Sequence, residues 1–153
     1  MSDPAKPNPA LPPLRSGWGI PPRLLLAEDE DDLREFLADQ FRAAGFHVIE
    51  AEDGMAMLEC LADASQATGQ QQAFDLIVSD VRMPGFTAFQ ILKNARFVLR
   101  GTPVILMTAF GDRRAHQRAA VLGAAAMFDK PLEIEELLQV ARRLVEKGSR
   151  HSK

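Results

Sequence analysis

From Arg23 onward, short apolar runs alternate with longer segments in which apolar residues recur every three or four positions. Runs that are apolar at nearly every position predict buried strands, and the three- and four-residue spacing predicts amphipathic helices. The expected strands are residues 23–27, 46–51, 74–79, 103–107 and 125–129. The expected helices are residues 31–44, 55–64, 88–97, 112–122 and 134–145, with a polar loop at 64–73.

Each expected helix has a set of apolar residues that should face the core. Gly45 is expected to end the first helix, because glycine is common at the position after a helix. The residues expected to point inward are Leu33, Phe36, Leu37 and Phe41 in the first helix, Leu58, Leu61 and Ala62 in the second, Phe89 and Leu92 in the third, and Leu137, Leu138, Ala141 and Leu144 in the last.

Five strands that alternate with five helices indicate an α/β fold, in which helices cover both faces of a parallel sheet. Right-handed crossovers leave few topologies. We expect the flavodoxin-like (βα)5 doubly wound parallel sheet with strand order 2-1-3-4-5. In that order a ligand binds outside the carboxyl ends of the strands, between the first and third strands.

The two ends of the chain differ in composition from the part between them. Most of the prolines lie in residues 1–22, among small and polar residues without apolar periodicity. We therefore expect a disordered proline-rich extension at 1–22, a folded domain at 23–146 and a flexible tail at 147–153.

The overall composition is that of an ordinary globular domain. The chain has 153 residues, of which 46% are hydrophobic and 25% charged, and its formal net charge of -3 argues against direct binding to nucleic acid. Cys60 is the only cysteine, so no disulfide framework can form, and no apolar run is long enough to span a membrane. We expect a cytoplasmic protein without a nucleic-acid or membrane partner.

Polar residues follow four of the five expected strands. Glu28 and Asp29 come after the first strand, Asp80 after the third, Thr108 after the fourth and Lys130 after the fifth. These strands are neighbours in the expected order, and their carboxyl ends meet at one edge of the sheet. Three carboxylates, a hydroxyl and an ammonium group should therefore converge in one crevice.

The chemistry of this set suits a divalent cation and a phosphoryl group. Neighbouring carboxylates raise one another's pKa unless a cation neutralises them, and Mg²⁺ binds one or two carboxylates while leaving room for phosphate oxygens. Lys130 and Thr108 supply the positive charge and the hydroxyl that a phosphoryl group requires. Asp80 lies centrally, and it is the candidate nucleophile that would form an aspartyl phosphate.

Four segments of the chain resemble, in order, the signature blocks of response-regulator receiver domains, the CheY-like family. They are "LLLAEDEDDLREFL", "DLIVSDVRMPG", "VILMTAF" and "FDKPL", and the resemblance extends from Arg23 to Val145. It implies that Asp80 accepts a phosphoryl group from a histidine kinase or a histidine phosphotransfer protein. It also implies that Mg²⁺ is held by Glu28, Asp29, Asp80 and the main-chain carbonyl of Arg82.

The resemblance assigns further roles around the acceptor. Thr108 and Lys130 would engage the phosphoryl oxygens and carry the signal outward, and Ala109 would keep the approach to Asp80 open. The Lys130-Pro131 peptide bond would be cis, which is plausible because X-Pro bonds lose most of the usual penalty.

The chain departs from the family pattern at several positions. Met127 stands at the switch position, where the family usually has Tyr or Phe; together with Thr108 it would form the switch, and its flexible side chain could pack in both states. Arg82 and Phe110 stand at variable positions that tune phosphoryl lifetime in the family. Arg82 could shield the phosphate or contact a partner, and the sequence leaves both alternatives open. Thr87 and Ala88 replace a common Asp-Gly pair.

Taken singly, each of these residues has an ordinary structural explanation. Asp80 could cap a turn, Thr108 could begin a helix, and Lys130 could be a surface charge. Asp31 and Asp32 suit the start of a helix, where the dipole favours acidic side chains. Three histidines lack the spacing of metal ligands and are interpreted as structural or exposed: His47, His116 and His151. Cys60 is interpreted as a small core residue rather than a nucleophile.

The leading functional hypothesis is a stand-alone receiver domain that is not an enzyme, apart from self-phosphorylation from small donors and self-dephosphorylation. It would signal to an unknown downstream protein, or form a homodimer, through the helix at 112–122, the strand at 125–129 and the last helix. An aspartyl-phosphate phosphatase is one alternative, although Arg82 stands where such enzymes need a second Asp. A non-phosphorylated scaffold is another, although the acceptor, both acidic residues, Thr108 and Lys130 are all present.

Overall fold

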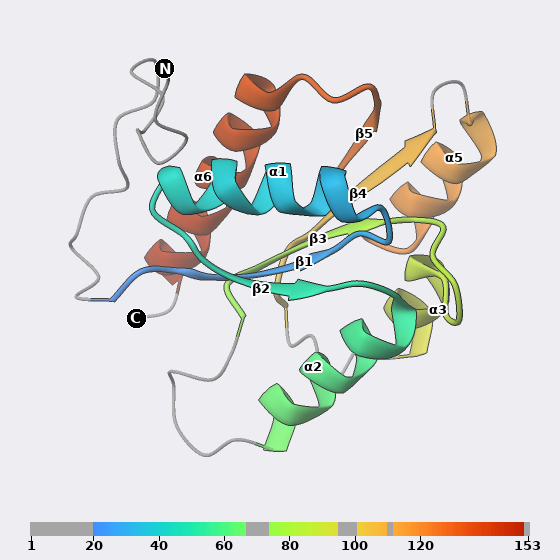
Figure 1. Cartoon of the computed structure of the whole chain (residues 1–153), viewed down its shortest axis with the longest axis horizontal. Coiled ribbons are helices and arrows are strands. Elements are labelled where there is room, and N and C mark those ends of the chain that lie inside the picture. Colours follow the sequence, from blue (N-terminus) through green and yellow to red (C-terminus); the bar gives the residue numbers. More distant parts are fainter. Residues whose placement is uncertain (1–19, 67–73, 95–100, 110–111, 152–153) are drawn as a thin grey trace.

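The computed structural model describes residues 20–66, 74–94, 101–109 and 112–151, which are built around a five-stranded parallel sheet (Figure 1). Its strands are β1 (Arg23–Ala27), β2 (His47–Ala51), β3 (Leu76–Asp80), β4 (Val104–Ala109) and β5 (Ala126–Lys130). They pair in the order β2-β1-β3-β4-β5, and every pair is parallel. The predicted fold class and strand order are therefore confirmed.

Helices cover both faces of this sheet. They are α1 (Asp31–Ala43), α2 (Gly54–Gln66), α3 (Ala88–Asn94), α5 (Arg113–Val121) and α6 (Ile134–His151). In Figure 1, α1 and α6 lie above the sheet and α2 and α3 lie below it. The buried residues of α5 belong to the same core layer as those of α2 and α3.

The alternation of side chains along each strand separates two core layers. Leu24 and Leu26 of β1 pack with α1 and α6, whereas Leu25 and Ala27 pack with α2, α3 and α5. Successive side chains of a strand point to opposite faces, so a strand that is covered on both sides must be apolar throughout. This requirement explains the continuous apolar runs in the sequence.

Helix α1 buries a narrower stripe than its sequence suggests. Leu37, Ala38 and Phe41 are fully buried, and Gly45, with φ of 105°, follows the helix in the left-handed conformation that glycine tolerates. Phe36 was predicted to face the core and is instead 46% exposed. The buried stripe passes through Leu37 and Phe41, so Phe36 lies beyond its edge.

Two other helices differ from the predictions. Met57 and Leu61 of α2 are buried in the core, while Ala62, predicted to point inward, is exposed. The helix also continues to Gln66, into the expected loop. Helix α6 continues to His151 rather than ending at Val145, and an ion pair between Arg142 and Glu146 lies on the turn where the predicted end falls. A helix tolerates one glycine, so Gly148 does not end it.

Several sequence predictions fall outside the described residues. They concern residues 1–19 of the extension, most of the loop before β3, the end of the third helix beyond Asn94, and Phe110.

Strand β4, which lies between β3 and β5, offers a test of the fold. Leu106 is fully buried, and Leu106→Ala should lower the free energy of unfolding by about 2–5 kcal/mol, because it removes apolar contacts and leaves a cavity. Val121 is 81% exposed, so Val121→Ala should change stability by less than about 0.5 kcal/mol. Urea denaturation of both variants measures the difference, and equal losses would contradict this description of the core.

Candidate functional site

Three charged residues lie on the same face of the sheet because they continue the alternation of their strands. Glu28 follows Leu24 and Leu26, Asp80 follows Leu76 and Val78, and Lys130 follows Ala126 and Phe128. All six apolar residues belong to the core layer beneath α1 and α6. The alternation therefore directs all three charged side chains to one side of the sheet, at the carboxyl ends of β1, β3 and β5.

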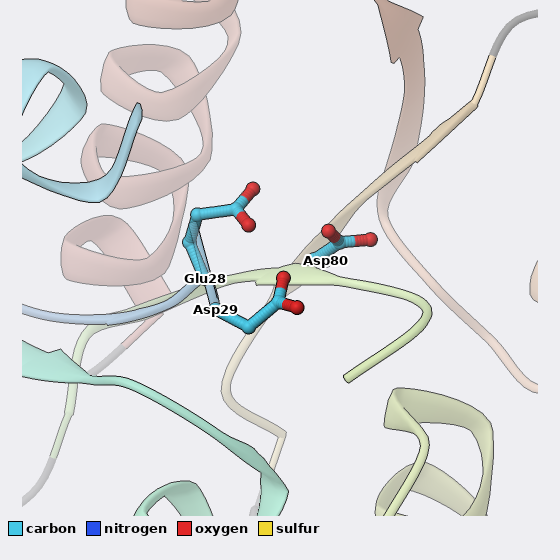
Figure 2. Close-up of side chains that lie close together, drawn as sticks. All are labelled: Glu28, Asp29 and Asp80. Carbon is cyan, nitrogen blue, oxygen red and sulfur yellow. The ribbon is translucent and has the colours of Figure 1, made fainter. Parts of the chain in front are cut away.

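The acidic side chains gather at this edge. Glu28, Asp29 and Asp80 each have a carboxylate oxygen within 4.8 Å of the others. Figure 2 shows the side chains of Glu28 and Asp29 reaching toward Asp80 from the end of β1. Glu28 is fully buried and Asp80 is 8% exposed, whereas Asp29 is exposed. The sequence prediction that these residues converge is thus met in the structure.

Lys130 joins two of the carboxylates. Its Nζ lies 2.8 Å from Glu28 Oε1 and 2.8 Å from Asp80 Oδ2. The backbone N–H of Glu30 donates to Glu28 Oε2 at 3.1 Å, and that of Arg82 donates to Asp80 Oδ1 at 3.1 Å. Each of the two carboxylates is therefore held by the ammonium on one oxygen and by a main-chain amide on the other. Hydrogen bonding of this kind fixes their orientation.

The electrostatics of the site reflect competition between burial and pairing. Burial raises the pKa of Glu28, the charge of Asp80 adds to that effect, and the hydrogen bond from Lys130 opposes it without cancelling it. For Lys130, burial alone would lower the pKa, but the hydrogen bonds to Asp80 and Glu28 together raise it. Lys130 therefore stays charged, and the ionised form of Glu28 remains costly.

The residues of β4 and β5 that were predicted to join the site lie next to it. Asp80 pairs in register with Met107, so Thr108, which is 1% exposed, is the next residue beyond that pair. Ala109 pairs with Lys130, and the Lys130-Pro131 bond is cis, as the sequence resemblance implied. Met127 is partly buried in the core layer beneath α2, α3 and α5.

Arg82 contributes its main chain to the site and its side chain to another contact. Its side chain is 80% exposed, and Nη2 lies 3.2 Å from Asp112 Oδ2. Asp112 also caps α5 by accepting the backbone N–H of Ala115 at 3.1 Å. The Arg82 side chain thus links the loop after β3 to the start of α5.

Sequence reasoning missed two residues that hold the site in place. Arg34 donates from Nη1 to the carbonyl of Glu28 at 2.9 Å, and its Nη2 pairs with Asp31 at 2.7 Å. Ser79 is buried and its Oγ donates to the carbonyl of Asp80 at 2.9 Å. The only sequence signal for Arg34 was its three-residue spacing from Asp31. Nothing in the sequence indicated the hydrogen bond of Ser79.

The residues interpreted as structural lie apart from the acidic cluster. His116 Nε2 lies 2.7 Å from Asp129 Oδ1, joining α5 to β5, and His47 is exposed at the start of β2. The side chain of His151 is outside the described residues. Cys60 is half-buried on α2, and burial raises the pKa of its thiol.

The donor set fits Mg²⁺. Carboxylate oxygens are hard ligands of the kind this ion prefers, and three carboxylates with one ammonium leave a formal charge of −2. A divalent cation would balance that charge. Glu28, Asp29 and Asp80 are the residues of this chain that would hold it.

The chain belongs to the response regulator receiver domain family, which it matches over residues 24–142. It is 38% identical over 116 residues to the transcriptional activator protein PfeR of Pseudomonas aeruginosa, a match that covers 76% of this chain and 35% of that protein. It is 26% identical to sporulation initiation phosphotransferase F of Bacillus subtilis, over 79% of this chain and 91% of that protein.

The chemotaxis response regulator CheY4 of Vibrio cholerae has a similar solved structure. The TM-score is 0.68 at 30% sequence identity, over 80% of this chain and 98% of that one. Receiver domains are phospho-acceptors in two-component signalling rather than classical enzymes, they bind Mg²⁺ at an acidic pocket, and they interact with histidine kinases or phosphotransfer proteins. Among the helices that the structure describes, none has the length and apolar character needed to cross a membrane.

Magnesium should stabilise the folded protein, because it binds the acidic cluster only when the cluster is assembled. At a concentration 100 times its Kd, the ion should add about 2.7 kcal/mol to the free energy of unfolding. Asp29→Asn removes one charged ligand and should weaken binding by roughly tenfold or more. Thermal melts with and without MgCl2 measure both effects, and Asp39→Asn, at an exposed position on α1, is the matched control. Equal responses of the two variants would exclude Asp29 as a ligand.

Cys60 should react slowly in the native protein. Its raised pKa leaves less thiolate at a given pH than in the unfolded chain, and the thiolate is the nucleophile. The rate of iodoacetamide alkylation should therefore rise with pH through a higher midpoint in the native protein than in urea. Mass spectrometry of quenched samples gives both rates. A native rate equal to or above the urea rate would contradict the structural role.

Proposed function

We propose that Asp80 is the phospho-acceptor of a signalling receiver domain. The observation that carries the proposal is the placement of a carboxylate, 8% exposed, at the end of the central strand β3, with Lys130 Nζ at 2.8 Å and two further carboxylates within reach of one metal ion. Family membership supports the same role. The assignments of Glu28, Asp29, Thr108, Ala109, Lys130 and the Arg82 carbonyl are part of this proposal.

The transfer is a single displacement at phosphorus. A bond forms between a carboxylate oxygen of Asp80 and the phosphorus atom while the bond from phosphorus to the donor's imidazole nitrogen breaks, and the electron pair stays on that nitrogen. Bound Mg²⁺ would supply charge neutralisation for the phosphoryl oxygens. Lys130, already held at Asp80, lies close enough to offer its ammonium to the same oxygens, and Thr108 offers its hydroxyl.

We propose a histidine kinase or a histidine phosphotransfer protein as the donor, as is usual for receiver domains. The match covers 91% of phosphotransferase F and 98% of CheY4, which supports a signalling role of the receiver domain itself. The expected setting is the cytoplasm, where such donors present their phosphohistidine. Contact with nucleic acid is not part of the proposal.

The proposed output is contact of the face formed by α5, β5 and α6 with a downstream protein or a second copy of the chain. Among the described residues, helix α5 buries Ala115 and Ala119. Its polar contacts are the Arg82–Asp112 and His116–Asp129 pairs and Arg118, which lies 5.0 Å from the centre of the Phe89 ring. Exposed or partly exposed contacts of these kinds contribute little free energy each, so this helix has weak attachment. Thr108, the residue expected to move on phosphorylation, pairs in register with Asp129. The His116–Asp129 pair therefore lies beside Thr108. Met127 lies in the layer that α5 covers.

Phosphorylation can be tested directly by intact mass. Incubation with MgCl2 and acetyl phosphate should add one phosphoryl group to the wild-type chain, because the donor supplies the group and Asp80 accepts it. Asp80→Asn should show no adduct, whereas Asp39→Asn, at an exposed carboxylate, should be modified like the wild type. A chelator should abolish the adduct in both reactive chains.

Two results would count against the proposal. An adduct that persists in Asp80→Asn would place the acceptor elsewhere. A wild-type chain that binds Mg²⁺ but takes no phosphoryl group from acetyl phosphate, or from other small donors, would favour the non-phosphorylated scaffold.

A further inference from the structure

Gly54, the first residue of α2, lies directly against the backbone of the loop that follows β3. A Cβ atom placed on Gly54 would lie 2.2 Å from the carbonyl oxygen of Phe86, 2.6 Å from its nitrogen and 2.9 Å from its carbonyl carbon. These distances are well inside van der Waals contact. All three atoms belong to the main chain, so no side-chain rotation can make room.

The close approach of the Phe86 backbone, and not backbone conformation, explains the glycine at position 54. The φ angle of Gly54 lies outside the left-handed region, unlike those of Gly85, Gly101 and Gly123. An alanine could adopt the same conformation, and alanine has the higher helix propensity. Propensity alone therefore predicts that Gly54→Ala would stabilise α2, while the contact with Phe86 predicts the opposite.

The start of α2 is tied to the same loop by hydrogen bonding. The N–H of Gly54, one of the donors that a helix leaves unpaired at its start, donates to the carbonyl of Pro84 at 3.2 Å. The carboxylate of Asp53 accepts the N–H of Ala56 at 2.7 Å and so caps the helix. The loop thus rests on a helix end that is itself fixed.

The other contacts of the loop fix its two ends. The N–H of Val81 donates to the carbonyl of Met107 at 2.9 Å, and the N–H of Ala88 donates to the carbonyl of Val81 at 3.1 Å. The peptide of Arg82 lies in the segment between Val81 and Ala88, and its N–H donates to Asp80 Oδ1. A shift of Phe86 away from α2 would have to be absorbed by the few residues between it and Asp80.

We propose that Gly54 is a positioning residue for the acceptor site: its lack of a side chain lets the loop after β3 approach α2 closely enough to place the Arg82 peptide against Asp80, one of the residues that would hold Mg²⁺. This inference rests on the proposed function of Asp80 as a phospho-acceptor with Mg²⁺. Gly54 itself contacts neither the ion nor the phosphoryl group.

The test compares Gly54→Ala with the wild type and with Gly101→Ala. Gly101 has φ of 81° with no atom within 4 Å of an added Cβ, and it precedes β4, at the end of the sheet away from the acidic cluster. Its substitution strains the backbone without displacing a neighbour, so it should lower the melting temperature but leave the site intact. Gly101→Ala therefore shows how much of any effect comes from reduced stability alone.

Three measurements on each full-length protein separate positioning from folding. They are the amide NMR shifts of Arg82 and Phe86 without metal, the Kd for Mg²⁺ by calorimetry, and the Mg²⁺ midpoint of phosphorylation by acetyl phosphate. For Gly54→Ala we expect shifted amides and a Kd and midpoint raised roughly tenfold or more, the size seen when groups that support metal ligands are altered. Gly54→Val should raise both further. Gly101→Ala should stay within about twofold of the wild type, because its effect is confined to local backbone strain.

Failure of the inference can be told apart from failure of the proposed function. If the wild type binds Mg²⁺ and is phosphorylated, but Gly54→Ala keeps wild-type amide shifts and Kd, the positioning role is overturned and the acceptor role stands. If Gly101→Ala loses Mg²⁺ affinity as much as Gly54→Ala, general stability is the cause and the inference also fails. If the wild type takes neither ion nor phosphoryl group, the proposed function fails, and the metal-free amide shifts still decide whether Gly54 sets the loop.

Discussion

The site depends on the shared register and direction of five parallel strands. Because all strands run the same way, their carboxyl ends meet at one edge, and because side chains alternate, the residue that follows each strand has a determined face. Glu28, Asp80 and Lys130 are distant in the sequence and meet only through this register. A one-residue slip of β5 would turn Lys130 away from both carboxylates. The strand order and register therefore determine which charged residues meet at this edge.

That charge pattern is a compromise between stability and binding. Glu28 is fully buried, and its raised pKa shows that burial outweighs its ion pair with Lys130. Lys130 compensates two carboxylates at once and leaves Asp29 unbalanced at the surface. A core of apolar residues at this edge would be more stable. The same uncompensated charge would favour a divalent cation at this edge, so the cost in stability would be offset when the ion binds.

The sequence predicted the fold and the convergence of the site because both depend on periodicity. The limits of β1 and the strand order could be predicted because buried parallel strands are apolar at every position. Phe36 and Ala62 were assigned wrongly because spacing shows which residues share a helix face, and not how wide the buried stripe is. The end of α6 was missed because the apolar stripe ends near Val145, and the polar turns that follow carry no apolar periodicity by which to recognise a helix.

The loop after β3 is held by contacts with distant parts of the chain and not by its place in a strand. This is why the residues that support it could not be predicted from the sequence. Asp80 is held by its strand, but the Arg82 peptide beside it is held by contacts with Met107 and with the start of α2, which lie far away in the chain. No periodic pattern records such contacts. The proposed acceptor Asp80 and the Arg82 carbonyl could therefore be named from the sequence, while the contacts that hold the Arg82 peptide in place could not. In this fold the strands decide which groups meet, and contacts between loops and helix ends decide how accurately they are placed.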